Sequence, residues 1–123
     1  HHFVDRSNRH EGANDARRIL RAVAQGQSVA FFPEGTFSAQ TGVARFHTGA
    51  FATAARAGVP VAPVAIRGTR RALRAKTFVP RWSRIEVEAL APLEGSGGIG
   101  DTAAQLRDAS RARIAASLDE PLL

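Results

Sequence analysis

The stretch Ser28-Val29-Ala30-Phe31-Phe32-Pro33-Glu34-Gly35-Thr36-Phe37-Ser38 sets the expectations for the rest of the chain. Its first half is rich in apolar and aromatic residues, which predicts a buried strand over 28–32, and Pro-Glu-Gly predicts a turn directly after it. Side chains at the end of a strand in an open α/β sheet face the crevice where such sheets bind ligands. We therefore expect Glu34 to belong to a ligand site.

The bulk composition indicates one domain. The chain has 123 residues, which is enough for a single core, and 44% of them are hydrophobic. It has no cysteine, so disulfides and thiolate metal sites are excluded. The longest apolar run, 59–66, contains two prolines and is far shorter than the roughly 18 residues of a membrane span. The chain opens without methionine in a strand-like segment, so we expect 1–123 to be a single domain truncated at its N-terminus.

The net charge of +6 comes almost entirely from arginine, since Lys76 is the only lysine. Such a charge favours an anionic partner, which can be phosphate groups, an acidic membrane surface or nucleic acid. The alternative is an ordinary set of solvated basic faces, and composition leaves both open. No nucleic-acid-binding motif accompanies the charge, so we expect no nucleic-acid partner.

Hydrophobic spacing predicts three helices. Apolar residues recur at three- and four-residue intervals over 13–25, and small residues dominate 48–57. Gly26 and Gly58 follow these two segments and are expected to end them. A third amphipathic helix is predicted over 101–118, with the aspartate at its start as the cap.

Four segments are predicted to be strands, and these are 2–6, 28–32, 61–66 and 82–90. The third has no polar alternation and is expected to be buried, whereas the fourth alternates and is expected to be half-exposed. The polar segment 7–12 is predicted to be a turn, and 67–78 is a basic connector without an assigned structure. The order β-α-β-α-β-β-α predicts an α/β fold with a central, mostly parallel or mixed sheet flanked by helices.

Three predicted strand ends carry polar residues, namely Asp5-Arg6, Pro33-Glu34-Gly35-Thr36 and Ile66-Arg67-Gly68. Parallel strands would bring these ends to one edge of the sheet, with a guanidinium, a carboxylate and free backbone amides together. Arginine suits a phosphate because its planar donors can bind two oxygens, and the glycine of the second end lets backbone approach a ligand. The alternative is that Arg6 and Glu34 form an ion pair that only closes the sheet edge.

Three blocks of the sequence, two of which include strand ends described above, together resemble a known family. Phe3-Val4-Asp5-Arg6, then Phe32-Pro33-Glu34-Gly35-Thr36 with Ser38, then Val59-Pro60-Val61-Ala62-Pro63-Val64 resemble the second, third and fourth blocks of the glycerolipid acyltransferases, in that order. Phe46-His47-Thr48-Gly49-Ala50-Phe51 is similar to the family's aromatic-basic-x-Gly segment. The resemblance is to the 1-acyl-sn-glycerol-3-phosphate acyltransferases in particular, and it implies a glycerol-3-phosphate acyltransferase-like fold.

The resemblance implies an enzyme of phospholipid biosynthesis. Such an enzyme moves an acyl group from acyl-CoA or acyl carrier protein to a hydroxyl of a lysophosphatidate-like acceptor. In the family, the arginine of block two and the Glu-Gly of block three help to bind the glycerol phosphate. These correspond to Arg6, Glu34 and Gly35, with Thr36 beside them. We expect no metal and no cofactor other than the thioester donor, and the oligomeric state is left open.

The resemblance also implies a peripheral location at the cytoplasmic face of a membrane. Basic residues within 67–84 would then contact anionic lipid, and the aromatic side chains of Phe78 and Trp82 interleave with Arg81. The alternative for this segment is a solvated basic connector whose aromatic residues cover the edge of the sheet.

The family's first block, His-x4-Asp, supplies a general base and the aspartate that orients it. It precedes block two, and no such pair precedes Arg6 here. His10 and Asp15 have the spacing but follow block two, where Asn14 or Asp15 can equally cap a helix. We therefore assign no catalytic residue to this chain and expect the base to lie upstream in a longer protein. The alternative function is a non-catalytic lipid- or phosphate-binding module.

Two further positions depart from the family pattern. Phe37 stands where arginine is common, which removes a cation, and Arg45 is close enough in sequence to compensate. His47 stands where lysine is common, so its charge near neutral pH is conditional. We interpret His47 as a partly exposed loop or helix-start residue.

Overall fold

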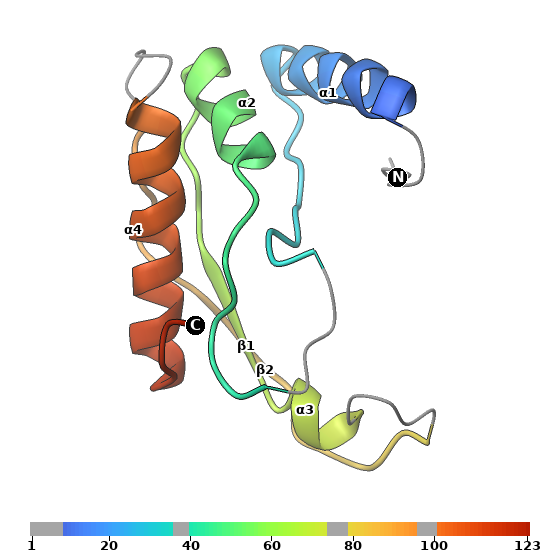
Figure 1. Ribbon diagram of the computed structural model, residues 1–123, viewed down its shortest axis with the longest axis vertical. Helices are drawn as coiled ribbons and strands as arrows, with labels where there is room; N and C mark the ends of the chain where they lie inside the picture. The colour runs from blue at the N-terminus through green and yellow to red at the C-terminus, as the bar shows by residue number, and fades with distance from the viewer. Residues whose placement is uncertain (1–8, 36–39, 74–78, 96–100) are drawn as a thin grey trace.

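The computed structural model describes residues 9–35, 40–73, 79–95 and 101–123. The helices and strands, in chain order, are α1 (Arg9–Ala24), α2 (Gly49–Ala57), β1 (Val64–Arg67), α3 (Thr69–Ala72), β2 (Glu86–Ala89) and α4 (Asp101–Leu118). Helix α2 packs against both α1 and α4, and α4 also contacts β1 (Figure 1). The short helix α3 lies at one end of the β1–β2 ribbon (Figure 1).

The three predicted helices are confirmed, and local sequence explains where they end. Gly58 follows α2 with a left-handed φ of 64°. Its N–H binds the Ala55 carbonyl at 3.3 Å, and the Val59 N–H binds the Ala54 carbonyl at 3.1 Å. These two bonds form a Schellman motif, which satisfies carbonyls that the end of the helix would leave unpaired. Gly26, with φ 81°, ends α1 in the same way.

Helix α1 begins earlier than its apolar spacing indicates. It starts at Arg9, so the turn predicted over 7–12 is wrong for 9–12, and neither Asn14 nor Asp15 lies at the helix start. Helix propensities of ordinary residues differ by less than about 1 kcal/mol, so arginine, glutamate and alanine can continue a helix through a polar stretch. Residues 2–6 lie outside the described part of the chain.

The predicted parallel or mixed central sheet is not what the described residues form. They form a two-stranded antiparallel sheet in which Val64 pairs with Ala89 and Arg67 with Glu86. Both strands are shorter than expected, and β2 is exposed along its whole length. In β1 only Ala65 is buried, so the prediction of a fully buried strand over 61–66 is wrong. Apolar alternation identifies a strand, but it does not specify the partner or the direction of pairing.

The segment 28–32 is not a strand, although its composition favours one. It pairs with no strand among the described residues, and Phe32 is 77% exposed. A strand needs a neighbouring edge that can satisfy its N–H and C=O groups. The described strand β1, the nearest candidate in the predicted order, pairs with β2 instead.

The core lies between α2, α4 and the segment 43–46. Phe46 and Phe51 are 5% and 4% exposed, and their rings stack with centroids 6.2 Å apart and planes at 9°. The other buried members of this cluster are Val43, Ala55, Ala103, Leu106 and Ala115. Over the described ranges, no helix has the length and apolar character needed to cross a bilayer.

We expect Phe51→Ala to lower the free energy of unfolding by about 3 kcal/mol, because it leaves a cavity between two helices. Phe32→Ala removes the same atoms from an exposed site and should change it by less than about 0.5 kcal/mol. Urea denaturation followed by circular dichroism measures both values. Equal losses from the two variants would contradict this description of the core.

Candidate functional site

The Pro-Glu-Gly turn predicted from the sequence is present. The Gly35 N–H binds the Phe32 carbonyl at 3.2 Å, which closes a four-residue turn with Pro33 in its second position. Glu34, in the third position, has no positive φ, whereas Gly35 has φ 77°. Proline second and glycine fourth are the residues that a type I turn prefers. The turn therefore follows from local sequence alone.

The segment 44–47 binds this turn at two points. The His47 N–H donates to the Pro33 carbonyl at 2.9 Å, and the Ala44 N–H donates to Glu34 Oε2 at 3.4 Å. The Glu34 side chain is half-buried. An ionised carboxylate has about four acceptor positions, so the one long bond from the described residues leaves most of its capacity available to other groups. Glu34 is thus held in place and can still accept hydrogen bonds from a ligand.

The structure does not describe the other two predicted site residues or the side chains of the His10 and Asp15 pair. Arg6 and Thr36 lie outside the described residues, as does Phe37, so their predicted role stays a prediction. His10 and Asp15 both lie within α1, and their side chains are likewise outside the described part.

Arg67, at the third predicted strand end, does not join Glu34 through any contact of the described residues. It binds Ser117 Oγ at 2.7 Å and Glu88 Oε2 at 2.9 Å, and Ser117 Oγ also donates to Glu88 at 2.8 Å. The Ser117 hydrogen bond, and after it the Arg67 guanidinium, lower the pKa of Glu88 below its ordinary value. Arg67 therefore holds β1, β2 and α4 together, because the strands pair antiparallel and its end of β1 faces that helix.

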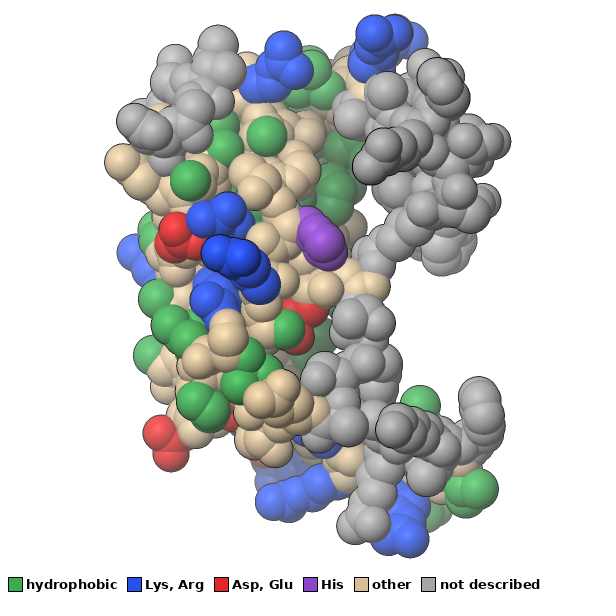
Figure 2. All heavy atoms as spheres, in the orientation of Figure 1, with side chains coloured by type: hydrophobic (Ala, Val, Ile, Leu, Met, Phe, Trp, Pro, Cys, Tyr) green, Lys and Arg blue, Asp and Glu red, His purple; other side chains and the backbone are tan. Residues whose placement is uncertain are grey.

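A second feature, which the sequence did not reveal, lies on the other side of the segment 43–47. It is a pocket of about 340 Å³ lined by Arg45, Phe46, Arg107, Asp108, Arg111 and Leu122. Figure 2 shows blue basic side chains gathered beside a red carboxylate on this face. Arg107 and Arg111 are four residues apart on α4, so they lie on the same side of the helix.

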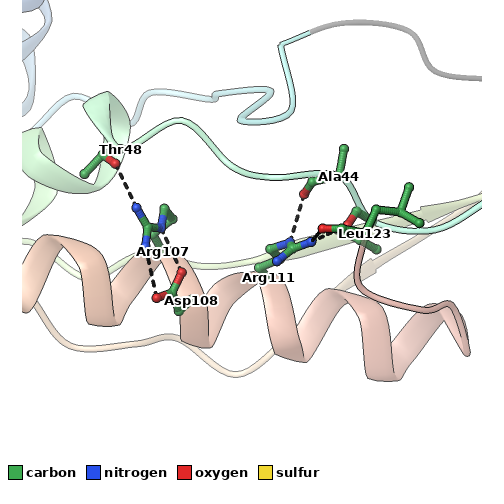
Figure 3. A network of polar contacts seen from close by, with 7 residues as sticks. Ala44, Thr48, Arg107, Asp108, Arg111 and Leu123 are labelled. Atoms are coloured by element: carbon green, nitrogen blue, oxygen red, sulfur yellow. Dashed lines mark hydrogen bonds and ion pairs between the residues drawn. The ribbon is translucent and has the colours of Figure 1, made fainter.

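Arg111 binds three main-chain carbonyls (Figure 3). Its Nε donates to Ala44 O at 2.9 Å, and its Nη2 donates to Val43 O at 2.9 Å and to Leu123 O. The segment around Val43 also pairs with the C-terminal residues, since the Val43 N–H binds Pro121 O at 2.9 Å. Arg111 thereby holds α4, residues 43–44 and residues 121–123 together.

Arg107 binds Asp108 through two parallel hydrogen bonds of 2.8 and 3.0 Å, and it binds Thr48 Oγ1 at 3.1 Å (Figure 3). These bonds to Arg107 lower the pKa of Asp108 below its ordinary value, and the charges of Arg111 and Arg45 lower it further. Asp108 is therefore a carboxylate at neutral pH. The pocket carries three guanidinium groups and one carboxylate, which is a net charge of +2.

A helix spacing of four residues between two arginines was visible in the sequence. Their contacts with Thr48 and Ala44 were not, because these span 59 and 67 positions of the chain. The prediction that His47 is exposed is confirmed, and its backbone, not its ring, supports the turn. The described residues include no group of three or more histidine or acidic side chains that could hold a metal ion.

The fold and this site define a mixed α and β protein with a carboxylate-bearing turn beside a cationic pocket. A family model described as Acyltransferase matches residues 1–67. The chain belongs to this acyltransferase family, as its sequence blocks predicted.

Curated relatives agree with this assignment. The chain is 35% identical over 127 aligned positions to a 1-acyl-sn-glycerol-3-phosphate acyltransferase of Haemophilus influenzae, with 98% of this chain and 51% of that protein covered. It is 34% identical over 127 positions to one from Chlamydomonas reinhardtii, with 100% of this chain and 36% of that protein covered. It is 30% identical over 118 positions to one from Escherichia coli, with 92% of this chain and 47% of that protein covered. The chain thus spans about half the length, or less, of these relatives. No solved structure matches it.

We expect Arg107→Gln to raise the pKa of Asp108 toward its ordinary value, since the two strongest hydrogen bonds to the carboxylate are lost. The stabilisation that this pair contributes is present while Asp108 is ionised, above its unfolded-state pKa. It is lost as the pH falls through the lowered folded-state value. Carboxyl ¹³C NMR titration of both proteins measures the pKa.

Glu88 is the internal control for this titration. Its pKa is lowered by Ser117 and Arg67, neither of which contacts Arg107, so it should titrate at the same pH in both proteins. An unchanged Asp108 midpoint in the variant would show that Arg107 does not hold this carboxylate.

Proposed function

We propose that this chain is part of an enzyme that acylates a lysophosphatidate-like acceptor, with acyl-CoA or acyl carrier protein as the donor. The acceptor hydroxyl oxygen forms a bond to the thioester carbonyl carbon, the carbon–sulfur bond breaks, and the hydroxyl proton leaves with the thiol. The relatives' names, 1-acyl-sn-glycerol-3-phosphate acyltransferase, support this reaction class.

The observation that carries the proposal for this chain is the geometry of Glu34. Its carboxylate sits on a turn whose position is fixed by hydrogen bonds from Ala44 and His47. A glycerol hydroxyl is a donor and needs such an acceptor, and a carboxylate that is already held in place loses little side-chain entropy on binding. We assign acceptor binding to Glu34 and Gly35, with Arg6 and Thr36 as further members of the site. The general base is not assigned to any residue of this chain.

We further propose an anionic membrane surface as a partner, as the basic segment 67–84 predicted. Trp82 is fully exposed and Val79 is 72% exposed, with Arg81 between them. Tryptophan is favoured at membrane interfaces because its ring is apolar and its N–H can remain hydrated. Arg67, Arg70 and Arg84 are less available for lipid, because they form ion pairs with Glu88, Glu120 and Glu86. The proposed contact therefore centres on residues 79–82.

The role of Glu34 is tested by Glu34→Gln in the complete gene product that contains this sequence. We expect the KM for lysophosphatidate to rise about tenfold, which is what loss of a charge-assisted hydrogen bond costs. The KM for the acyl donor should change less than about twofold. Glu94→Gln removes the same charge from an exposed position outside the turn and should leave both constants unchanged.

Equal increases in both KM values for Glu34→Gln would show that Glu34 has a structural role only. A complete gene product that binds glycerol 3-phosphate but transfers no acyl group would instead favour the non-catalytic lipid- or phosphate-binding module.

A further inference from the structure

The pocket between α4 and the segment 43–47 is separate from the residues assigned to the acceptor. Of its six lining residues, none belongs to the turn that carries Glu34. Ala44 nevertheless connects the two features. Its N–H binds Glu34 Oε2, and its carbonyl accepts a hydrogen bond from Arg111 Nε. The pocket and the turn therefore share one peptide segment.

The arginines of this pocket retain unused donors among the described residues. A guanidinium has five N–H groups. Arg111 uses Nε and both N–H groups of Nη2, which leaves the two of Nη1. Arg107 uses one N–H on each of its three nitrogens, which leaves one on Nη1 and one on Nη2. Arg45 has no hydrogen bond or ion pair within the described part of the chain, and it acts on Asp108 only through its charge.

Two of the three guanidinium groups are already fixed. Arg111 is held by the neutral carbonyls of Val43 and Ala44 and by Leu123 O, which is an oxygen of the terminal carboxylate in the 123-residue chain. Arg107 is held by Thr48 and by Asp108, the one carboxylate of the pocket. Because these side chains are ordered before any ligand arrives, little side-chain entropy is lost when an anion binds. Arg45 is exposed and lines the same pocket from the segment 43–47.

We propose that this pocket is a phosphate-binding site and that its ligand is a phosphomonoester. A phosphate offers three oxygens to the planar guanidinium groups of the arginines, and its charge is opposite in sign to the net charge of the side chains that line the pocket. The volume of about 340 Å³ accommodates a phosphate with a small attached group. Phe46 and Leu122 also line the pocket, and their apolar side chains can contact the group attached to the phosphate.

Phosphate binding itself does not depend on the acyl transfer proposed above. The identity of the attached group does rest on that proposal, since both the acceptor headgroup and the nucleotide of a CoA donor carry a phosphomonoester. These two sources differ in the group next to the phosphate, so a competition experiment separates them.

The site is tested on the 123-residue chain by NMR titration with inorganic phosphate, observing the arginine Nε–Hε signals. We expect saturable shifts for Arg45, Arg107 and Arg111, and no such shifts with sodium chloride at the same ionic strength. Arg45→Gln should weaken phosphate binding at least about fivefold, because a charge-assisted hydrogen bond is lost. Within the described part of the chain Arg45 makes no hydrogen bond or ion pair that its removal would break, so this variant should fold normally.

Arg56→Gln is the matched control, because Arg56 is an exposed arginine in the last turn of α2 and does not line the pocket. It removes the same charge and should change phosphate affinity less than about twofold. Non-saturable shifts, shifts reproduced by sodium chloride, or equal weakening by the two variants would each overturn the proposal.

The source of the phosphomonoester is read from displacement of inorganic phosphate. Displacement by glycerol 3-phosphate at the lower concentration assigns the pocket to the acceptor headgroup. Displacement by adenosine 3′,5′-bisphosphate at the lower concentration assigns it to the nucleotide of the donor. Failure of both compounds to displace phosphate would contradict a phosphomonoester ligand. None of these results depends on whether the complete protein transfers an acyl group.

Discussion

The hydrogen bonds from Arg111 to three main-chain carbonyls are the interaction on which the rest of the site depends. The segment 42–47 belongs to no helix or sheet, and its pairing with the C-terminus is a single parallel bridge between Val43 and Leu122. A buried backbone without regular pairing must satisfy its carbonyls by other means. Val43 is 1% exposed, and its carbonyl accepts hydrogen bonds from both the Leu123 N–H and the Arg111 guanidinium, whereas the Ala44 carbonyl accepts one from Arg111 Nε.

Once this segment is fixed, both functional features acquire their positions. Phe46 holds it to α2 by stacking on Phe51, and the N–H groups of Ala44 and His47 hold the turn that carries Glu34. Arg45 lies between these contacts and reaches the pocket formed with α4. In this member of the acyltransferase family, one short segment, 42–47, therefore contacts both the turn that carries Glu34 and the cationic pocket beside α4.

What the sequence predicted correctly was local. Gly58 and Gly26 end their helices because a left-handed residue is needed there, and Pro33 and Gly35 form their turn for reasons contained in four residues. The predicted parallel or mixed sheet does not appear among the described residues, because the alternation in 82–90 does not encode the direction or partner of a strand. The pocket was missed because Arg107 and Arg111 contact residues far away in the chain, and Arg45 enters it from another segment.

The central claim is that Arg111 positions the segment 42–47. Native-state hydrogen exchange of Arg111→Met tests it most directly, with Arg113→Met as the control because Arg113 lies on the same helix but binds Ala91 O. We predict that the amides of Val43 and His47 exchange about tenfold faster in Arg111→Met, whereas the Ala52 amide inside α2 and all three amides in Arg113→Met keep their protection. Unchanged exchange at Val43 and His47, or an equal loss of protection at Ala52, would contradict this account.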